Sequence, residues 1–366
     1  MTIFKPLSTE DRVSTKTLLH EAIPVTGTIL SGTYSDNNIQ DFSHGMFQSV
    51  YDYPYLSSSA NHIFDISFGV SDDSALYSSV SVQKSKKNNV YNQMAQILAG
   101  YDKNGNIQNF DEDGNLTGGE KINNAMFLAF SRLLVKDEIK KGSFSLTVGT
   151  SASYDENGGV FDQVVTITDQ GAATSYRVNS PAGEYGILYA TGANGVLDTS
   201  STHTASVDGT TYWRAGLIFY QAGVIALTSS MFMTASEGGY LLSGSCEWNS
   251  DQLTLTGALT GSEISSSANG LRTRIQNVEF NNTIELNSTV YFCRAKHNEF
   301  NYSSNPTYLT GSQIRVKTNA TDTPISYITS IGLYSADNQL LAVGKFSEPI
   351  RKDRTIELTF RARLDY

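Results

Sequence analysis

Residues 355–366 have the sequence TIELTFRARLDY, and this closing stretch decides the interpretation of the fold. Apolar and polar residues alternate in it without a break. The apolar positions are Ile356, Leu358, Phe360, Ala362, Leu364 and Tyr366, and the residues between them are Glu357, Thr359, Arg361, Arg363 and Asp365. A period of two predicts a β-strand with one buried and one exposed face. The apolar face of such a strand must be covered by the rest of the fold or by a neighbouring subunit.

Earlier segments supply a sheet for this strand. Residues 327–334 (YITSIGLY) and 340–346 (LLAVGKF) are separated by a short polar loop, which is the pattern of a hairpin. Residues 289–296 and 313–317 show the same alternation. We predict at least five antiparallel strands in a C-terminal β module of residues 284–366.

The composition describes a folded protein with few charges. Hydrophobic residues make up 39% of the 366 residues and charged residues 17%, which argues against a disordered chain. The net charge of −10 argues against phosphate backbones and anionic membranes as partners, so we expect neither nucleic acid nor a membrane. The most apolar stretch, residues 215–227, is too short to span a bilayer.

The chain has two cysteines, Cys246 and Cys293. Residues 1–10 lack the basic-then-apolar pattern of a signal peptide, so the sequence does not indicate an oxidising compartment. We therefore predict two buried free thiols rather than a disulfide.

One part of the chain has helical periodicity. In residues 87–101 the apolar positions follow the i, i+4, i+7, i+8 spacing of one helix face. They are Val90, Met94, Ile97, Leu98 and Tyr101. Residues 120–141 repeat the pattern at Ile122, Met126, Phe130, Leu133 and Leu134. We predict a helical pair with a turn-rich connection over residues 87–142.

The connection between these segments has oxygen-bearing side chains at alternate positions, as calcium-binding loops do. They are Asp102, Asn104 and Asn106, followed by Asp111, Asp113 and Asn115. Neither group has the full spacing of a helix–loop–helix calcium site, and tight turns at Asn104-Gly105 and Asp113-Gly114 explain the same residues. We expect the turns and no cofactor, and keep Asp111, Asp113 and Asn115 as weak metal candidates.

The other regions are β-rich. Residues 1–86 are interpreted as an arm with a mixed β region, with strands at 26–34 and 63–70. Residues 143–260 alternate short β runs with Asn, Gly and Asp turns, as sandwiches and barrels do, and we expect a further strand at Leu253 and Leu255. The serine-containing residues 261–283 are interpreted as a linker.

The predicted fold class is mainly β with a small α part (α+β). It consists of antiparallel β-sandwich or barrel modules plus the helical pair.

The sequence shows no motif for catalysis. The five histidines include no i, i+4 pair, and neither a G-x-S-x-G elbow nor a phosphate loop occurs. Cys293 and His297 are four residues apart, but the strand predicted there points the thiol inward. Paired carboxylates for glycoside hydrolysis have no fixed spacing and stay open. We expect no enzymatic activity.

A family resemblance rests on five segments: residues 291–308 (YFCRAKHNEFNYSSNPTY), 327–334, 340–346, 358–366 (LTFRARLDY) and 89–101 (NVYNQMAQILAGY). These segments resemble virion structural proteins of large tailed bacteriophages, especially T-even-like phages of marine bacteria. The resemblance implies a component of the tail, baseplate or neck that is present in several symmetric copies. It also implies assembly in the host cytoplasm and residence in the virion.

We therefore expect a structural component of a virion, in a wedge-type baseplate or neck position, whose partners are other virion structural proteins in a symmetric homo- or hetero-oligomer. The interface candidates are Tyr51, Tyr53, Tyr55, Phe300, Tyr302, Arg351, Lys352 and Arg354, although core packing or a solvated loop explains each of them as well. Alternatives are a receptor- or glycan-binding protein of a fibre, a head or vertex decoration protein, and a depolymerase.

Overall fold

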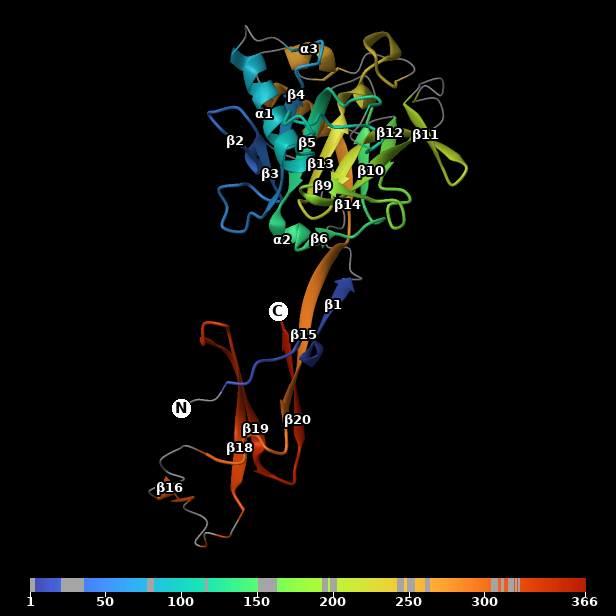
Figure 1. The fold of residues 1–366 in the computed structure, drawn as a ribbon. Helices are drawn as coiled ribbons and strands as arrows, with labels where there is room; N and C mark the ends of the chain where they lie inside the picture. Colours follow the sequence, from blue (N-terminus) through green and yellow to red (C-terminus); the bar gives the residue numbers. More distant parts are fainter. Residues whose placement is uncertain are drawn as a thin grey trace. The chain divides into compact units, whose positions relative to one another are not determined.

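The computed structural model describes residues 4–20, 36–77, 82–115, 118–150, 163–192, 197, 203–241, 247–248, 254–260, 264–303, 309–310, 313–314, 319, 321 and 323–366. The chain divides into two compact units (Figure 1). The large unit is Leu19–Ile284, and the small unit combines Met1–Leu18 with Glu285–Tyr366. The predicted C-terminal β module thus lies almost entirely in the small unit, together with the first residues of the chain.

The large unit is built on one sheet. In order of hydrogen bonding its strands are β14 (Ile275–Glu279), β7 (Ser145–Gly149), β8 (Val164–Thr168), β10 (Gly183–Gly192), β12 (Thr210–Phe219), β13 (Val224–Thr228), β5 (Asn124–Phe130), β4 (His62–Val70), β3 (Gln48–Tyr51) and β2 (Ile39–Asp41). β9 (Arg177–Ser180) pairs with β10, and β11 (Thr204–Val207) pairs with β12. The pairings described are antiparallel. The predicted fold class, mainly β with a small α part, is confirmed.

The helix predicted at residues 87–101 is confirmed as α1 (Val82–Leu98), which packs on β4. Gly69 in β4 permits the close approach, because a Cβ built there would lie 2.8 Å from the backbone of Tyr91. The Tyr91 ring packs in the core against Phe110 and Phe127, and its hydroxyl donates to the carbonyl oxygen of Ile122 at 2.8 Å. The helix and the sheet therefore share one aromatic core.

The second predicted helix is wrong. Residues 120–141 form β5, the short helix α2 (Arg132–Val135) and β6 (Glu138–Ile139). The spacing of four between Met126 and Phe130 also fits a strand, because every even-numbered residue of a strand shares one face. β5 lies between β4 and β13, and most of its residues are buried on both faces.

The linker predicted at residues 261–283 is also wrong where the structure describes it. It contains α4 (Ile264–Arg274) and then β14, which pairs with β7. The apolar residues Ile264, Ala268, Leu271 and Ile275 are buried at helical spacing, and the surrounding serines conceal this pattern.

Of the strand expected at Leu253 and Leu255, Leu253 lies outside the described residues and Leu255 begins the helix α3 (Leu255–Thr260) instead. The strand expected at residues 26–34 lies outside the described residues, whereas the one at 63–70 is confirmed as β4.

The small unit contains a narrow sheet and a separate ribbon. The sheet has the order β1 (Arg12–His20), β15 (Asn282–Ala295) and β20 (Leu358–Asp365), and the first residues of β15 pair with β6 within the large unit. The ribbon pairs β18 (Ile325–Tyr334) with β19 (Leu340–Asp353), and β16 (Leu309–Thr310) pairs with β17 (Gln313–Ile314). The predicted closing strand and the hairpin before it are confirmed, and their pairings are antiparallel.

Candidate interaction surface

The small unit has almost no hydrophobic core. Of the described residues in this unit, Ala295 is the one apolar residue that is buried, whereas the core cluster lies wholly in the large unit. β20 alternates as its sequence predicts, but its apolar residues, such as Phe360 and Leu364, are only half-buried. The apolar face of the closing strand is therefore formed but not fully covered within the chain.

Large apolar side chains are exposed over the same unit. They are Phe4, Leu7, Val13, Leu18, Leu286, Phe300, Tyr302, Tyr327, Tyr334, Leu340, Leu341, Val343 and Tyr366. At the tip of the ribbon, Leu341 and Val343 are 68% and 61% exposed. Exposed apolar side chains gathered on one unit of a folded protein indicate an interaction surface, so the small unit is the candidate interface.

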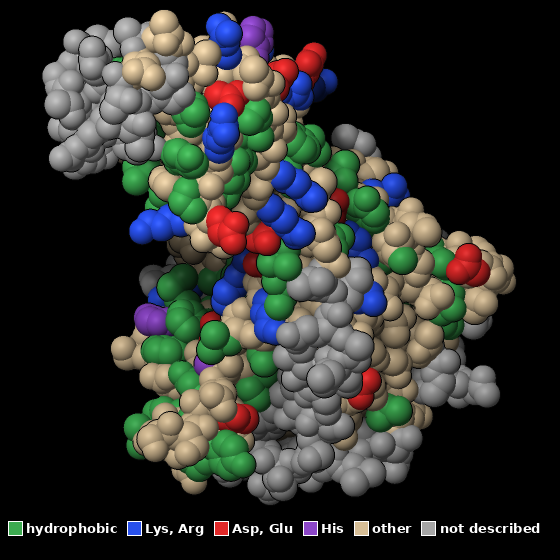
Figure 2. Space-filling view, turned by 90° about the horizontal axis from the view of Figure 1, so that it is seen from below, with side chains coloured by type: hydrophobic (Ala, Val, Ile, Leu, Met, Phe, Trp, Pro, Cys, Tyr) green, Lys and Arg blue, Asp and Glu red, His purple; other side chains and the backbone are tan. Residues whose placement is uncertain are grey.

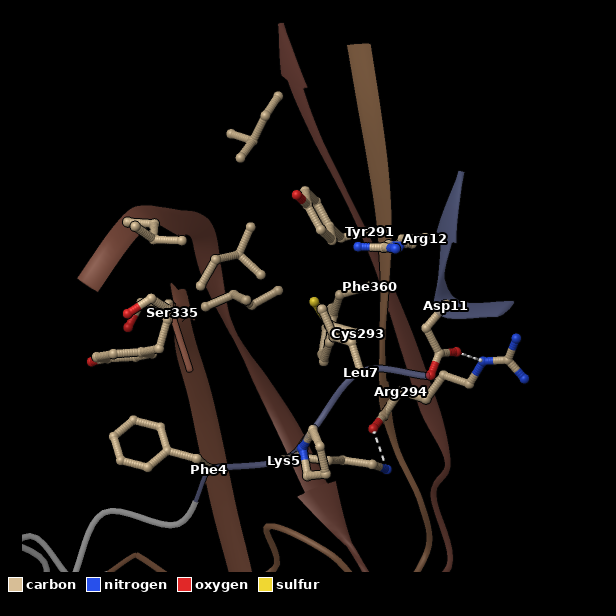
Figure 3. Close-up of a pocket in the computed structure, with 18 of the residues that line it drawn as sticks. Phe4, Lys5, Leu7, Asp11, Arg12, Tyr291, Cys293, Arg294, Ser335 and Phe360 are labelled. Atoms are coloured by element: carbon tan, nitrogen blue, oxygen red, sulfur yellow. Dashed lines mark hydrogen bonds and ion pairs between the residues drawn. The ribbon is translucent and has the colours of Figure 1, made fainter. Parts of the chain in front are cut away.

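A groove of about 840 Å³ lies between the ribbon and the narrow sheet (Figure 3). Leu333 and Tyr334 of β18 line one wall, and Phe360 and Leu364 of β20 line the other. The N-terminal segment crosses the groove, and the ring of Phe4 contacts the ring of Tyr334 edge-on at 4.7 Å between centroids. The groove thus combines segments from both ends of the sequence.

Charged groups position the N-terminal segment beside β15. Lys5 Nζ donates to the carbonyl oxygen of Arg294 at 2.8 Å and pairs with Glu299 Oε2 at 2.5 Å. Arg294 Nε pairs with Asp11 Oδ1 at 2.9 Å. The pKa of Asp11 is lowered mainly by hydrogen bonds from Ser8 and further by Arg294, and the pKa of Glu299 is lowered mainly by its bond to Lys5. Exposed pairs of this kind fix geometry more than they stabilise the fold.

Cys293 lines the groove as a free thiol. It is half-buried rather than buried as predicted, because its strand lies in a unit with too little covering structure. Partial burial raises the pKa of the thiol, which keeps it protonated and unreactive near neutral pH. Cys246 lies outside the described residues.

The aromatic interface candidates fall in both units. Tyr51, Tyr53 and Tyr55 belong to the large unit, where the rings of Tyr51 and Tyr55 lie 6.3 Å apart and Tyr53 is 58% exposed. Phe300 and Tyr302 are exposed on the small unit, and Phe300 lines the groove.

The three basic candidates lie at the end of β19 and in the turn after it. Arg351 pairs with Asp353 of its own strand at 3.0 Å. Lys352 is fully buried, and its ammonium group donates to Asn301 Oδ1 at 2.7 Å and to the carbonyl oxygen of Asp353 at 2.9 Å. Arg354 is exposed. Lys352 therefore serves the internal packing of the small unit, and its ammonium group does not face a partner.

The metal candidates form a turn in the large unit. Asp111 pairs with Lys121, the backbone N–H of Asp113 donates to Asp111 Oδ1 at 3.0 Å, and that of Asn115 donates to Asp113 Oδ1 at 3.0 Å. Gly114 has a φ of 69°, as the predicted tight turn requires. Burial raises the pKa of Asp111. Within the described ranges, no group of three His, Cys, Asp or Glu residues is arranged to hold a metal.

A buried polar cluster lies near this turn. Glu112 accepts a hydrogen bond from Tyr240 Oη at 3.0 Å, and its other oxygen lies 2.7 Å from His203 Nδ1. The bond to Glu112 raises the pKa of His203, and burial raises the pKa of Tyr240. Both carboxylate oxygens are thus satisfied by side chains of the large unit, which fits a structural role.

The two units differ in charge. The small unit has 13 Lys and Arg residues against 10 Asp and Glu, a net charge of +3, whereas the large unit has 13 against 26, a net charge of −13. On the face drawn in Figure 2, hydrophobic side chains are interspersed with Lys and Arg side chains. The two units therefore carry opposite net charges.

Sequence reasoning missed the groove residues Phe4, Leu7 and Leu341. For Leu341 the sequence contained a signal, because it lies in the apolar run LLAV (residues 340–343). Consecutive apolar residues in a strand predict contacts on both of its faces. The contribution of the N-terminal segment had no local signal.

Comparison with known proteins gives no match to any family model, curated protein or solved structure. Among the described helices, none is both long and apolar enough to cross a membrane.

Proposed function

We propose that the protein is a structural subunit of a virion, placed in the baseplate or neck, that assembles through its small unit and has no turnover of its own. The single observation that supports assembly is the uncovered apolar face of the small unit. The virion setting follows from the family resemblance of the segments around β15, β18, β19 and β20.

Energetics favour a partner for this unit. A two-stranded ribbon such as β18–β19 is at best marginally stable alone, and a narrow sheet with a half-buried apolar face adds little core. Apolar surface stabilises a structure only when it is removed from water, by roughly 25 cal/mol per Å². Contact with another subunit supplies this burial.

The glycan-binding alternative receives no support from the tryptophans. Trp213 and Trp248 are 7% and 0% exposed. Trp248 Nε1 donates to the carbonyl oxygen of Ser267 at 2.9 Å, and Arg274 stacks on its ring. Neither ring is available for stacking on a sugar.

Cryo-electron microscopy of purified particles tests the proposal. We expect the large unit, with its antiparallel sheet and α1, to fit density at the baseplate or neck in a fixed number of copies. We further expect the small unit to be the part in contact with neighbouring subunits. Absence of the chain from purified particles, or its presence only at fibre tips, would refute the proposal.

A further inference from the structure

We infer that residues 4–7 form a strap that closes the groove of the small unit and can open while the rest of that unit stays folded. The strap crosses the groove in the structure and ends on the ring of Tyr334 (Figure 3). The inference rests on the proposed assembly function for its purpose alone, because a strap regulates access to the apolar surface through which we propose that the chain assembles.

One end of the strap is anchored. The hydroxyl of Ser8 donates to Asp11 Oδ2 at 2.8 Å, and the backbone N–H of Asp11 donates to the carbonyl oxygen of Ser8 at 3.1 Å. Asp11 also pairs with Arg294, and β1, which follows, is hydrogen-bonded to β15. The chain is therefore fixed from Ser8 onward, and opening is a swing of residues 4–7 about this point.

The other end is held by few contacts. Residues 4–7 form no helix or strand, and none of their backbone groups is hydrogen-bonded to another backbone group that the structure describes. Phe4 is 43% exposed and Leu7 is 40% exposed, so little apolar surface is removed from water there. The contacts that remain are the ring of Phe4 on Tyr334 and the bonds of the Lys5 ammonium group.

These contacts are weak enough for the strap to open at equilibrium. The side chains of Lys5 and Glu299 are 30% and 32% exposed, and an exposed ion pair changes an equilibrium by a factor of about five at most. An aromatic pair contributes a factor of about two to ten. Together they favour the closed state by a factor on the order of a hundred, which leaves about one chain in a hundred open.

The ribbon and the narrow sheet keep other contacts when the strap opens. The rings of Phe346 on β19 and Phe360 on β20 lie 4.8 Å apart between centroids. The ammonium group of the buried Lys352 donates to Asn301 Oδ1 and to the carbonyl oxygen of His297, which joins β19 to the segment after β15. Neither contact involves the strap, so its opening exposes the groove without separating the ribbon from the sheet.

Cys293 reports on the position of the strap. Its half-buried thiol lines the same groove as Phe4, Lys5 and Leu7. Burial raises the pKa of this thiol, and the charge of the nearby Asp11 raises it further. A thiol reagent therefore reaches Cys293 faster when the strap is open.

The test is the rate at which dithiodipyridine, a neutral thiol reagent, labels the full chain in a Cys246→Ser background. The reaction is followed at about pH 8.5, the ordinary pKa of a cysteine thiol. We expect Lys5→Glu to raise the rate about tenfold, because it removes the pair and places a like charge beside Glu299. The matched control is Lys345→Glu, at an exposed ribbon lysine outside the groove lining, and it should leave the rate unchanged.

Two further measurements separate access from charge. Phe4→Ala should raise the rate about two- to tenfold with no change of charge, because it removes the ring contact with Tyr334. Salt at about 1 M should speed labelling of the unsubstituted strap and not of Lys5→Glu, because only the former has an ion pair to screen. Circular dichroism and urea unfolding of each variant check that the fold and its stability are unchanged.

Equal rates with and without Lys5→Glu, or an equal rise in the Lys345→Glu control, would overturn the inference. Labelling of the unsubstituted strap as fast as that of the urea-unfolded chain would also overturn it. The particle experiment separates the two proposals. A strap that opens as expected in a chain absent from particles refutes the virion role alone, whereas unchanged labelling in a chain found in particles refutes the strap alone.

Discussion

Replacing Asp169 by asparagine gives the sharpest test of the forces inside the large unit. Asp169 is 2% exposed. Its carboxylate accepts hydrogen bonds from the backbone N–H groups of Gly142 at 2.7 Å and Phe144 at 3.0 Å, and from Tyr220 Oη at 3.1 Å. Burial raises the pKa of Asp169 to about 6 in spite of these donors, which favour the ionised form.

The sign and size of the pH dependence follow from this pKa. The unfolded value is 3.8, so the folded protein binds the proton more tightly between about pH 4 and pH 6. The stability that Asp169 contributes is complete below pH 3.8 and is lost as the pH rises through about 6. Because the folded pKa is about two above the unfolded value, Asp169 loses about 3 kcal/mol of its contribution to the free energy of unfolding as the pH rises through this range.

Urea unfolding at several pH values from 3.5 to 7.5 measures this loss. The buried Trp213 and Trp248 report on the large unit by fluorescence. We expect the free energy of unfolding of the wild type, minus that of Asp169→Asn, to fall by about 3 kcal/mol across the range. Asp102→Asn is the control, because the pKa of Asp102 is lowered and its contribution changes in the opposite direction. A difference that is constant or rises with pH would refute the reasoning.

Three further substitutions test the packing of the large unit by urea unfolding at pH 7. Phe127→Ala should cost about 3–5 kcal/mol, because the ring is buried in the aromatic core. Gly69→Ala should cost about 1–3 kcal/mol, since the new methyl group would meet the backbone of Tyr91. Lys121→Ala should lower the free energy of unfolding by about 3 kcal/mol, because it leaves the buried Asp111 unpaired. Millimolar calcium should leave the melting temperature of the wild type unchanged, because Lys121 already neutralises this carboxylate.

Each of these substitutions has a control. Phe360→Ala, at a half-buried ring, should leave large-unit unfolding unchanged, and an equal loss would show that the two units do not unfold separately. Gly105→Ala tests a glycine with open space around it, so its cost reflects only its φ of 85°. Lys103→Ala removes an exposed lysine of the neighbouring turn and should have little effect. Calcium-dependent stabilisation of the wild type would contradict the account of Asp111.

The fold class could be predicted because local periodicity and the structure agree in most strands. β20 is the best case, because its eight residues, Leu358–Asp365, lie within the twelve residues 355–366 that alternate without a break. The helix predicted over β5 failed because Ile122, Met126 and Phe130, at spacings of four, satisfy both periods, and only the neighbouring strands decide between them. The helix α4 was missed because serines separate its apolar residues.

The site was harder to predict because its residues come from distant segments. Phe4 contacts Tyr334 across more than 300 residues of sequence, and no local pattern encodes such a contact. Lys352 shows the same limit, since its basic neighbours suggested a solvated surface whereas its ammonium group is satisfied by backbone and side-chain oxygens. Exposure of an apolar face is a property of the whole unit, so the strand pattern predicted a buried face without showing what would cover it.

The strand order β1–β15–β20 has a consequence for synthesis. β1 leaves the ribosome early, but its sheet partner β15 begins at Asn282, after nearly all of the large unit has been made. Domains fold as units during translation, so the large unit folds before β1 can pair with β15. The sheet of the small unit therefore forms last, after the strongly acidic large unit has folded.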